Sequence, residues 1–585
     1  MKGGFTLRAQ PTERRVTAAF PGLDARERIP EGALHDARNL TTAKYPLLAT
    51  RPRRGLVATL TAPGGLTAKD ALAWVDGGTL YLNGLATALT GLAEGEKQLV
   101  SMGAFLCVFP DKVYYNTADP SDYGSMEADY ASLGDVSYSL CRADGRPYTN
   151  VWRGDAEPAD SSAELWLSTA GGELAALVWS AAAGAWTALD TVYTKLTFAS
   201  QGAVPALFSA GDGVTVSGSA FAEANGEKII CALGGAEGSE NDWIVLVGLL
   251  ESAFTQTEGS VRLERKLPPL DFVCEAGNRL WGCFYGFDGE RTLNEICASA
   301  LGDFKNWRQY RGLSTDSWAA SVGSDGPWTG AVSYLGSPCF FKADRVHRVG
   351  VSAIGAHTLQ ETVCRGVQRG SHKSLAVLNE TLFYKSADGV CAWQGGFPLG
   401  VGEALGETRY FDAVGGAAAG RYVLSMRDAS GDWALFVYDL SRALWMREDD
   451  LHALQFAALD GELCALDAET GKILALFGTA GEPEGDFAWS AESGLIGLGT
   501  PERKYLSRLE LRLRLGEGAS AAAYLQFDSD GVWHEAGAVA RGTLGTALLP
   551  LRPRRCDHLR LKLCGTGEME LLSVAHVYET GSDVV

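Results

Sequence analysis

The stretch that decides the fold is LPPLDFVCEAGNRLWGCFYGF, residues 267–287, in which two short apolar strands flank a Gly-Asn turn. The same unit recurs along the following part of the chain, with short strands, a tight turn of Gly, Asp or Asn, and an aromatic near a strand end. The recurrences span residues 271–285, 295–307, 318–349, 375–393, 422–445 and 456–476. Helical periodicity is missing from all of them, and strands at this spacing are typical of a β-propeller or a stacked β-array.

Length and composition indicate a large globular protein. A chain of 585 residues exceeds one ordinary core, and 46% hydrophobic with 21% charged residues excludes a disordered chain. No window approaches the roughly 20 apolar residues of a membrane span. Residues 1–16 are basic but lack the apolar segment of a signal peptide. We therefore expect synthesis and folding in a cytoplasm, with no membrane insertion.

The twelve cysteines are scattered along predicted strands among apolar neighbours, without a C-x-x-C motif or a Cys/His cluster. This pattern favours buried, reduced thiols over disulfides or metal ligands.

Charge is unevenly distributed along the chain, whose net charge is −20. Residues 1–60 carry eleven basic and five acidic side chains, whereas residues 118–264 carry six basic and twenty-one acidic ones, a net −15. An acidic block of this size repels nucleic acid, so nonspecific DNA binding by the whole surface is not expected. The alternative is a solvated acidic face that aids solubility.

The chain divides into five predicted parts. Residues 1–60 are rich in proline and predict an extended arm, with a helical turn only near 33–39, lying on its own propeller or on a neighbouring subunit. Residues 61–117 alternate strongly and predict a first propeller blade. Residues 118–264 predict an inserted acidic β-domain, and residues 265–480 the remaining blades. Residues 485–585 predict a β-sandwich, with Leu and Arg alternating over 509–515.

The fold class predicted is therefore all-β: a β-propeller of six or seven blades, with an inserted β-domain and a C-terminal, jelly-roll-like sandwich. Pairing between the two ends of the propeller would close the ring and remove free strand edges.

No motif for catalysis, a cofactor or a metal stands out, and the prediction is a protein that is not an enzyme. Ser324–Trp328 is too short for a glycosidase Asp-box and predicts a blade turn. Asp528–Gly531 begins like a calcium loop but lacks the closing acidic residue, which favours a hairpin turn. The eight histidines, His347 and His372 among them, are dispersed along the chain.

Two short basic clusters are candidates for subunit contacts, against the alternative of solubilising surface charge. They comprise Arg51, Arg53 and Arg54 near the start, and Arg552, Arg554 and Arg555 near the end. Single surface ion pairs contribute little, so only a network across an interface would matter.

Several short sequence motifs resemble those of an uncharacterised family of virion proteins from phages and prophages of Firmicutes. Within the repeats they are Asp271–Val273, Asn278–Cys283, Leu301–Trp307, Ser314–Ser317, Cys364–Gln368 and Trp445–Asp450. Outside the repeats they are Gly22–Asp24, Asp36–Asn39, Arg51-Pro52, Leu551–His558 and Tyr578–Asp583. The arm, together with Ser299–Asp303, is more distantly similar to the propeller proteins of short-tailed phages that form the tail nozzle or hub.

The resemblance implies a structural virion protein of a tailed bacteriophage, located in the neck or tail and made in the bacterial cytoplasm. It implies a homo-oligomeric ring that contacts portal, adaptor or tail components, with DNA passing through without specific binding. It carries over no catalytic residue. Fold likeness alone does not fix a function.

An alternative is a tail protein that binds a receptor or carbohydrate, such as a host-surface glycan. The inserted domain holds five tryptophans on which sugars could stack: Trp152, Trp166, Trp179, Trp186 and Trp243. Tryptophan in strands is more often a core residue, and both interpretations stay open at this point.

Overall fold

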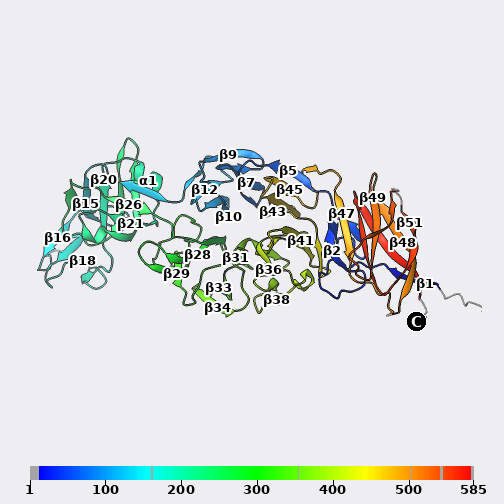
Figure 1. Cartoon of the computed structure of the whole chain (residues 1–585). Coiled ribbons are helices and arrows are strands. Elements are labelled where there is room, and N and C mark those ends of the chain that lie inside the picture. Colours follow the sequence, from blue (N-terminus) through cyan, green and yellow to red (C-terminus); the bar gives the residue numbers. More distant parts are fainter. Residues whose placement is uncertain (1–11, 160–161, 353–354, 501, 541–543, 581–585) are drawn as a thin grey trace, which may run out of the picture.

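The computed structural model describes residues 12–159, 162–352, 355–500, 502–540 and 544–580. Its strands form twelve sheets, and helical elements are few and short. Figure 1 shows an elongated molecule, with the inserted domain at one end, the propeller in the middle and the sandwich at the other end. The predicted all-β fold is confirmed. Two terminal segments, residues 1–11 and 581–585, lie outside the described residues. The first belongs to the predicted N-terminal arm, and the second includes the end of the resembling motif Tyr578–Asp583.

Seven antiparallel sheets form the propeller blades, which we call A to G in chain order. Blade A comprises β6 (Pro63–Ala68), β7 (Leu72–Asp76), β8 (Thr79–Leu82) and β9 (Leu85–Thr90), and blade B comprises β10 (Gln98–Met102), β11 (Phe105–Phe109), β12 (Val113–Asn116) and β13 (Tyr123–Ser125). Blade C comprises β27 (Phe272–Glu275), β28 (Leu280–Phe287), β29 (Thr292–Ala298) and β30 (Trp318–Ser321), and blade D comprises β31 (Gly330–Tyr334), β32 (Ser337–Lys342), β33 (Arg345–Val351) and β34 (His357–Val363).

Blades E to G complete the ring after the short turn η2 (His372–Ser374), with η3 (Glu403–Leu405) between E and F. Blade E comprises β35 (Ala376–Leu378), β36 (Thr381–Ser386), β37 (Gly389–Trp393) and β38 (Leu399–Gly400), and blade F comprises β39 (Tyr410–Ala418), β40 (Arg421–Asp428), β41 (Trp433–Asp439) and β42 (Leu444–Arg447). Blade G comprises β43 (Ala453–Leu459), β44 (Glu462–Asp467), β45 (Lys472–Ala475) and β46 (Glu482–Pro483). The first strands lie around the axis, and β43 contacts β6, so the ring is closed.

Blade G is completed by a strand from the other end of the propeller. β5 (Gly55–Thr59) inserts between β45 and β46 and pairs antiparallel with both. Gly55 is required at this point, because a Cβ there would lie 1.7 Å from the carbonyl oxygen of Ala480. The predicted pairing between the two ends therefore occurs, and it removes the free edge of β45.

The prediction of a single blade over residues 61–117 is wrong. This segment holds all of blade A and three strands of blade B, whose fourth strand is Tyr123–Ser125. The inserted domain therefore begins after Met126 rather than at residue 118. The polar sequence between residues 118 and 125, with two Asp and two Ser, obscured an outer strand that lies at the blade edge.

The aromatics near the strand ends fill the wedges between neighbouring blades. Between blades D and E, Tyr334 and Phe341 pack against Trp393, with ring centroids 5.0 and 6.1 Å apart. Tyr384 of blade E lies 5.3 Å from Phe341. Large rings at these positions bury much apolar area per residue, which explains the aromatic of the repeat.

The inserted domain contains three sheets. The first sheet has the strand order β14 (Ala128–Ala131), β26 (Arg262–Arg265), β21 (Gly213–Ser217), β22 (Gly226–Ile229). The second has the order β23 (Ala232–Ala236), β24 (Glu240–Val247), β20 (Tyr193–Phe198), β15 (Val136–Cys141), β25 (Phe254–Gln256). The third has the order β16 (Val151–Gly154), β17 (Leu165–Ser168), β18 (Ala175–Ser180), β19 (Ala185–Ala188). The short helix α1 (Ala203–Leu207) and the turn η1 (Ala222–Ala224) join the strands. The first two sheets share one core.

Entry to and exit from the inserted domain are adjacent, because β14 and β26 pair with Ala128 opposite Arg265. The loop between β29 and β30 fastens the domain to blade C. Its Asn306 accepts a hydrogen bond from the Gly213 backbone at 3.1 Å and donates one to the Gly211 carbonyl at 2.9 Å. Arg279 of blade C holds that loop by donating to the carbonyls of Ser299, Ser314 and Asp316 at 2.6–2.7 Å.

The sandwich consists of two sheets. One holds β3 (Leu40–Thr41), β4 (Leu48–Thr50), β53 (Met569–Thr580), β48 (Lys504–Leu515) and β51 (Gly545–Cys556), with β1 (Thr12–Thr17) also on β53; the other holds β2 (Leu34–Arg38), β47 (Ala488–Ser493), β52 (Leu559–Thr566), β49 (Ser520–Phe527) and β50 (His534–Val539). From β47 to β53 the chain changes sheet at each step except at the β49–β50 hairpin, as in jelly-roll folds.

The N-terminal arm contributes to both the sandwich and the propeller of its own chain. Four of its strands complete the two sandwich sheets before β5 enters blade G. The predicted helical turn near residues 33–39 is wrong, since Leu34–Arg38 forms β2 and pairs with β47. Pairing with strands more than 400 residues away outweighs the local preference.

The Leu/Arg alternation of β48 is confirmed as a half-buried strand. Leu509, Leu511 and Leu513 are buried in the sandwich core, whereas Arg512 and Arg514 are exposed. The twelve cysteines are unpaired, and eight are buried. Within the described ranges, no helix has the length and apolar character to cross a membrane.

Candidate functional site

Two of the six arginines predicted to contact other subunits lie inside the chain. Arg51 and Arg54 are 4% and 3% exposed, at the junction of propeller and sandwich. Arg54 pairs with Glu448 at 3.0 Å and with Asp449 at 2.6 Å. Burial raises the pKa of Glu448 above its usual value, although Arg54 opposes the shift. These two residues cannot reach a partner subunit, which corrects that part of the prediction.

Arg51 extends the same network toward the sandwich. Its Nε donates to Asn39 Oδ1 at 2.7 Å, it pairs with Glu484, and its guanidinium lies 4.2 Å from the centroid of the Phe487 ring. Further ion pairs join β2 to the loop after β42, including Arg38 with Asp450 at 2.5 Å. The basic cluster therefore fastens two domains of one chain.

The remaining arginines are accessible to different degrees. Arg53 is bound at 2.6 Å to Asp486, and Arg554 at 3.0 Å to Asp530. Arg552 is exposed on β51, and Arg555 lies opposite Tyr505 on the neighbouring strand. For these four, contact with another subunit stays a prediction.

One opening of the propeller axis is crossed by the turn η2. Lys373 pairs with Glu96, before blade B, at 2.7 Å and donates to the Leu454 carbonyl of blade G at 2.8 Å. His372 packs on Phe272 of blade C with ring centroids 5.0 Å apart. Burial lowers the pKa of His372 to about 4, so this ring is neutral at pH 7. The turn thus ties blades B, C, E and G together across the axis.

Beside this turn is a pocket of about 310 Å³. Gln98, Lys112, Asp271 and His372 line it together with apolar residues of blades B and C. Gln98 bridges the two blades, because its side chain both donates to the Val273 carbonyl and accepts from the Val273 backbone N–H. Glu96 also lines it, and its polar residues have partners elsewhere in the chain: Glu96 pairs with Lys373, and Lys112 pairs with Glu127.

A second cluster brings Ser324, His347 and Glu361 together between blades C and D. Ser324 Oγ and Glu361 Oε2 lie 3.0 and 3.2 Å from the same ring nitrogen, His347 Nε2. In a nucleophile relay the acid binds the nitrogen opposite the nucleophile, so this geometry does not provide one. Burial lowers the pKa of His347. The sequence did not indicate this cluster, because its members lie on separate strands and loops.

No group of three or more His, Cys, Asp or Glu residues suited to a metal occurs in the described part of the chain. Asp528–Gly531 joins the paired strands β49 and β50, which confirms the predicted hairpin turn. Its Asp528 accepts from the backbone of Asp557 at 2.7 Å, and Asp530 from Val532 at 3.0 Å.

The most distinctive exposed feature is one face of the β16–β19 sheet, which we call the tryptophan face. Trp152 is opposite Trp166 in the parallel β16–β17 pair, and Trp179 is opposite Trp186 in the β18–β19 hairpin. Trp166 is opposite Leu177, which lies two residues before Trp179. Because cross-strand partners and residues two apart share a face, all four tryptophans project from the same side.

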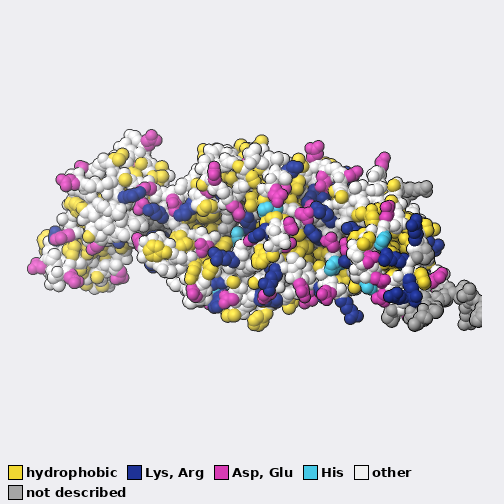
Figure 2. All heavy atoms as spheres, viewed as in Figure 1, with side chains coloured by type: hydrophobic (Ala, Val, Ile, Leu, Met, Phe, Trp, Pro, Cys, Tyr) yellow, Lys and Arg dark blue, Asp and Glu magenta, His cyan; other side chains and the backbone are white. Residues whose placement is uncertain are grey.

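The two sides of this sheet are both apolar but differ in exposure. Leu165, Leu167 and Ala176 are buried in a small core on the other side. On the tryptophan face, Trp152 is 47% and Trp179 38% exposed. The sheet lies at the end of the inserted domain away from the propeller in Figure 1, and Figure 2 shows hydrophobic side chains and carboxylates among the other atoms of this end.

The rings of the tryptophan face are held in place. Trp186 lies edge to face between Trp166 and Trp179, with centroids 5.9 Å from each. The indole N–H groups of Trp152 and Trp166 donate to the carbonyls of Ala156 and Gly154 at 3.2 and 3.0 Å. The fifth tryptophan of the domain, Trp243, belongs to another sheet and is covered by Lys195 at 4.2 Å.

Comparison with known proteins yields no family: no family model matches the chain, and no curated protein does. Solved structures that match include an exo-β-1,3-galactanase of Phanerochaete chrysosporium with galactose, at TM-score 0.22 and 9% identity over 52% of this chain and 94% of that one. A glycoside hydrolase matches at TM-score 0.20 and 9% identity, covering 52% and 96%. An engineered GH43 glycoside hydrolase with endo-xylanase and exo-arabinofuranosidase activity matches at TM-score 0.21 and 9% identity, covering 53% and 96%.

These matches contradict the prediction that the chain is not an enzyme, and that prediction is withdrawn, because all three structures are glycoside hydrolases. A likeness at this TM-score and identity assigns neither an activity nor a substrate to the chain.

Proposed function

We propose that this chain is a structural protein of a tailed-phage virion, which forms a homo-oligomeric ring in the neck or tail of the nozzle or hub type. DNA would pass through the opening between copies. The axis of each propeller is not the passage in this proposal, because Lys373 and Glu96 meet across it.

The proposal is supported by the positions of the motifs that resemble the virion-protein family, because several of them lie at the joints between domains. Asn278–Cys283, Leu301–Trp307 and Ser314–Ser317 contribute Arg279 and Asn306, with their partners, to the joint between propeller and inserted domain. Trp445–Asp450 and Asp36–Asn39 meet at the joint between propeller and sandwich. The resembling motifs therefore lie at hydrogen-bonded and ion-paired connections among the inserted domain, the propeller and the sandwich, which supports a load-bearing role in a particle.

The charge of the inserted domain fits such a place. Its net charge of −12, from nineteen acidic and seven basic side chains over residues 127–265, would keep DNA from adhering if the domain faced the passage, since like charges repel at contact distances. Closed rings are also the usual outcome of homo-oligomer symmetry.

Labelling of intact virions with an antibody against the full chain, viewed in negative stain, tests the placement. We expect label at the neck or tail. Label on the head shell, or absence of the chain from purified particles, would refute the assignment. Sedimentation of the purified chain tests the ring separately, and a monomer at all concentrations would contradict it.

A further inference from the structure

We propose that the tryptophan face binds a neutral oligosaccharide. This inference concerns a surface of the inserted domain and does not depend on where the chain is placed in a virion.

The chemistry of the face suits a neutral ligand. Arg153 is the only charged residue in the four strands, and it alternates to the opposite side, where it pairs with Glu251. Between the indoles lie only Leu177 and small residues, among them Ser168 and Ala188. An uncharged surface of flat rings matches the C–H faces of pyranose sugars, which stack on aromatics.

Charge around the face excludes several other occupants. The domain (residues 127–265) carries a net charge of −12, with Asp155, Glu157 and Asp190 just beyond the strand ends. Nucleic acid and phosphate-bearing polymers would be repelled, and so would a second copy of the same acidic domain. The same carboxylates can accept hydrogen bonds from sugar hydroxyls at the rim of the face.

The size of the face argues against a protein partner. Four strands of four to six residues present about 200–300 Å². A standard protein interface buries about 800 Å² per partner, so a protein would have to extend over the acidic surroundings. A quaternary ammonium ligand needs rings arranged as a cage, whereas these rings project from one sheet face.

The side chains of the tryptophan face are already held in place without a ligand. Trp152 and Trp166 are fixed by hydrogen bonds to backbone carbonyls, and Trp186 is held between two other rings. Less ordering of side chains is then required on binding, which favours affinity from a small contact area.

The test uses the full chain on an array of neutral oligosaccharides, with sulfated and phosphorylated glycans and immobilised choline as the other arms. Hits are measured in solution by titration calorimetry and tryptophan fluorescence. We expect binding to one or more neutral glycans only. Trp152→Ala and Trp179→Ala should each weaken it at least about tenfold, whereas Trp152→Phe and Trp179→Phe, which keep a ring, should retain most of it.

Phe397→Ala is the matched control, because Phe397 is a 79% exposed aromatic on the propeller. It should leave binding unchanged. Absence of neutral glycan binding by the native chain, preference for an anionic glycan or choline, or full binding by both alanine variants would overturn the proposal. So would a change of oligomeric state in the alanine variants, which would assign the face to contact between copies.

Discussion

Arg54 holds two carboxylates inside the junction of propeller and sandwich, and it is the residue whose loss should matter most there. Replacing it with alanine leaves the buried Glu448 and the half-buried Asp449 without this partner. Breaking a buried pair in this way costs about 3–5 kcal/mol. We expect Arg54→Ala to lower the denaturant midpoint of the propeller and sandwich accordingly.

Arg552→Ala is the control for that variant, because Arg552 belongs to the other predicted basic cluster but is exposed. Its effect should stay within about 0.5 kcal/mol. Equal stability of the two variants in urea unfolding would show that the buried pairs do not hold the junction.

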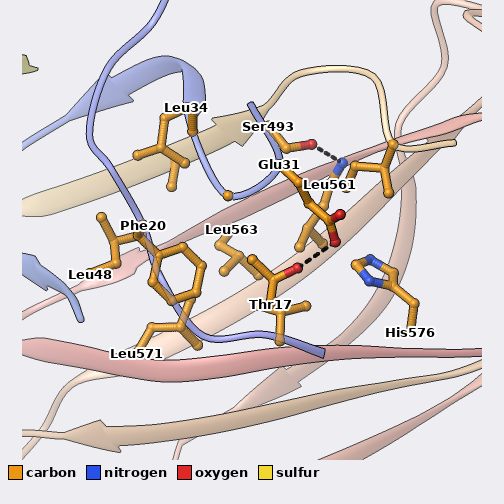
Figure 3. A pocket seen from close by; sticks show the side chains of 15 residues that line it. Thr17, Phe20, Glu31, Leu34, Leu48, Ser493, Leu561, Leu563, Leu571 and His576 are labelled. Carbon is orange, nitrogen blue, oxygen red and sulfur yellow. Dashed lines mark hydrogen bonds between the residues drawn. The ribbon is translucent and has the colours of Figure 1, made fainter. Parts of the chain in front are cut away.

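His576 provides a pH dependence at the scale of one residue. It lies on β53 beside Glu31, at the edge of the small apolar pocket under the N-terminal arm (Figure 3). The ring is 2% exposed, and neither ring nitrogen has a hydrogen-bond partner among the described residues. Burial lowers the pKa of His576 from 6.5 to about 4, although Glu31 opposes the shift.

The sign of the effect follows from this lowered pKa. Above pH 6.5 the ring is neutral in both states, and below that value the unfolded chain takes up a proton that the folded chain refuses. Stability should therefore fall as pH decreases from 6.5 to about 4, by about 3 kcal/mol in total. His576→Leu should lose this part of the acid sensitivity in thermal unfolding at pH 7 and 4.5. An unchanged pH dependence in the variant would contradict the assignment.

At the scale of elements, β5 closes the propeller, and Gly55 decides whether it fits. A Cβ at this position would lie 1.7 Å from the Ala480 carbonyl oxygen, between two strands that cannot separate without breaking blade G. We expect Gly55→Ala to destabilise the chain by at least about 1–3 kcal/mol, the usual cost of overpacking. Hydrogen exchange should show the loss first in β5, β45 and β46.

Gly485→Ala is the matched control, since nothing lies within 4 Å of a Cβ there and its backbone is not in the left-handed region. It should leave stability and exchange unchanged. Faster exchange spread evenly over all blades in Gly55→Ala would argue against β5 as the closing element.

Most strands of the blades and of the sandwich could be predicted from the sequence, but the strands of the arm, the outer strand β13 and the strand partners could not. The alternation of β48 sufficed for its buried and charged faces, because Leu and Arg differ strongly in polarity. In β17 the residues on both faces are apolar, so Leu165 and Trp166 could be assigned to core and surface only from register. β2 was misjudged for a related reason, since its partner β47 is more than 400 residues away. The basic cluster at 51–54 likewise has its carboxylate partners far along the chain, among them Glu448, Glu484 and Asp486.

For the whole molecule, connectivity predicts which parts unfold together. The arm completes both sandwich sheets and then closes blade G, so propeller and sandwich share one continuous set of strand pairings. The inserted domain has its own core and joins the propeller through two adjacent strands and the Asn306 loop. Calorimetry should therefore show two transitions, one for the inserted domain and one for the other two bodies together.

Excision of residues 128–265 tests this division. Because Ala128 and Arg265 are cross-strand partners, an Asn-Gly turn can connect Glu127 to Lys266 without moving either end. The variant keeps the Lys112–Glu127 ion pair and the Glu127 bond to the Leu267 backbone, so the exit from blade B should remain in place. It should lose the transition of the inserted domain and keep the other within about 5 °C. The reciprocal excision of residues 485–580 should give an insoluble chain, because β1 to β4 lose their partners. A soluble product from that second excision, or collapse of the first, would show that cooperativity does not follow the strand pairing.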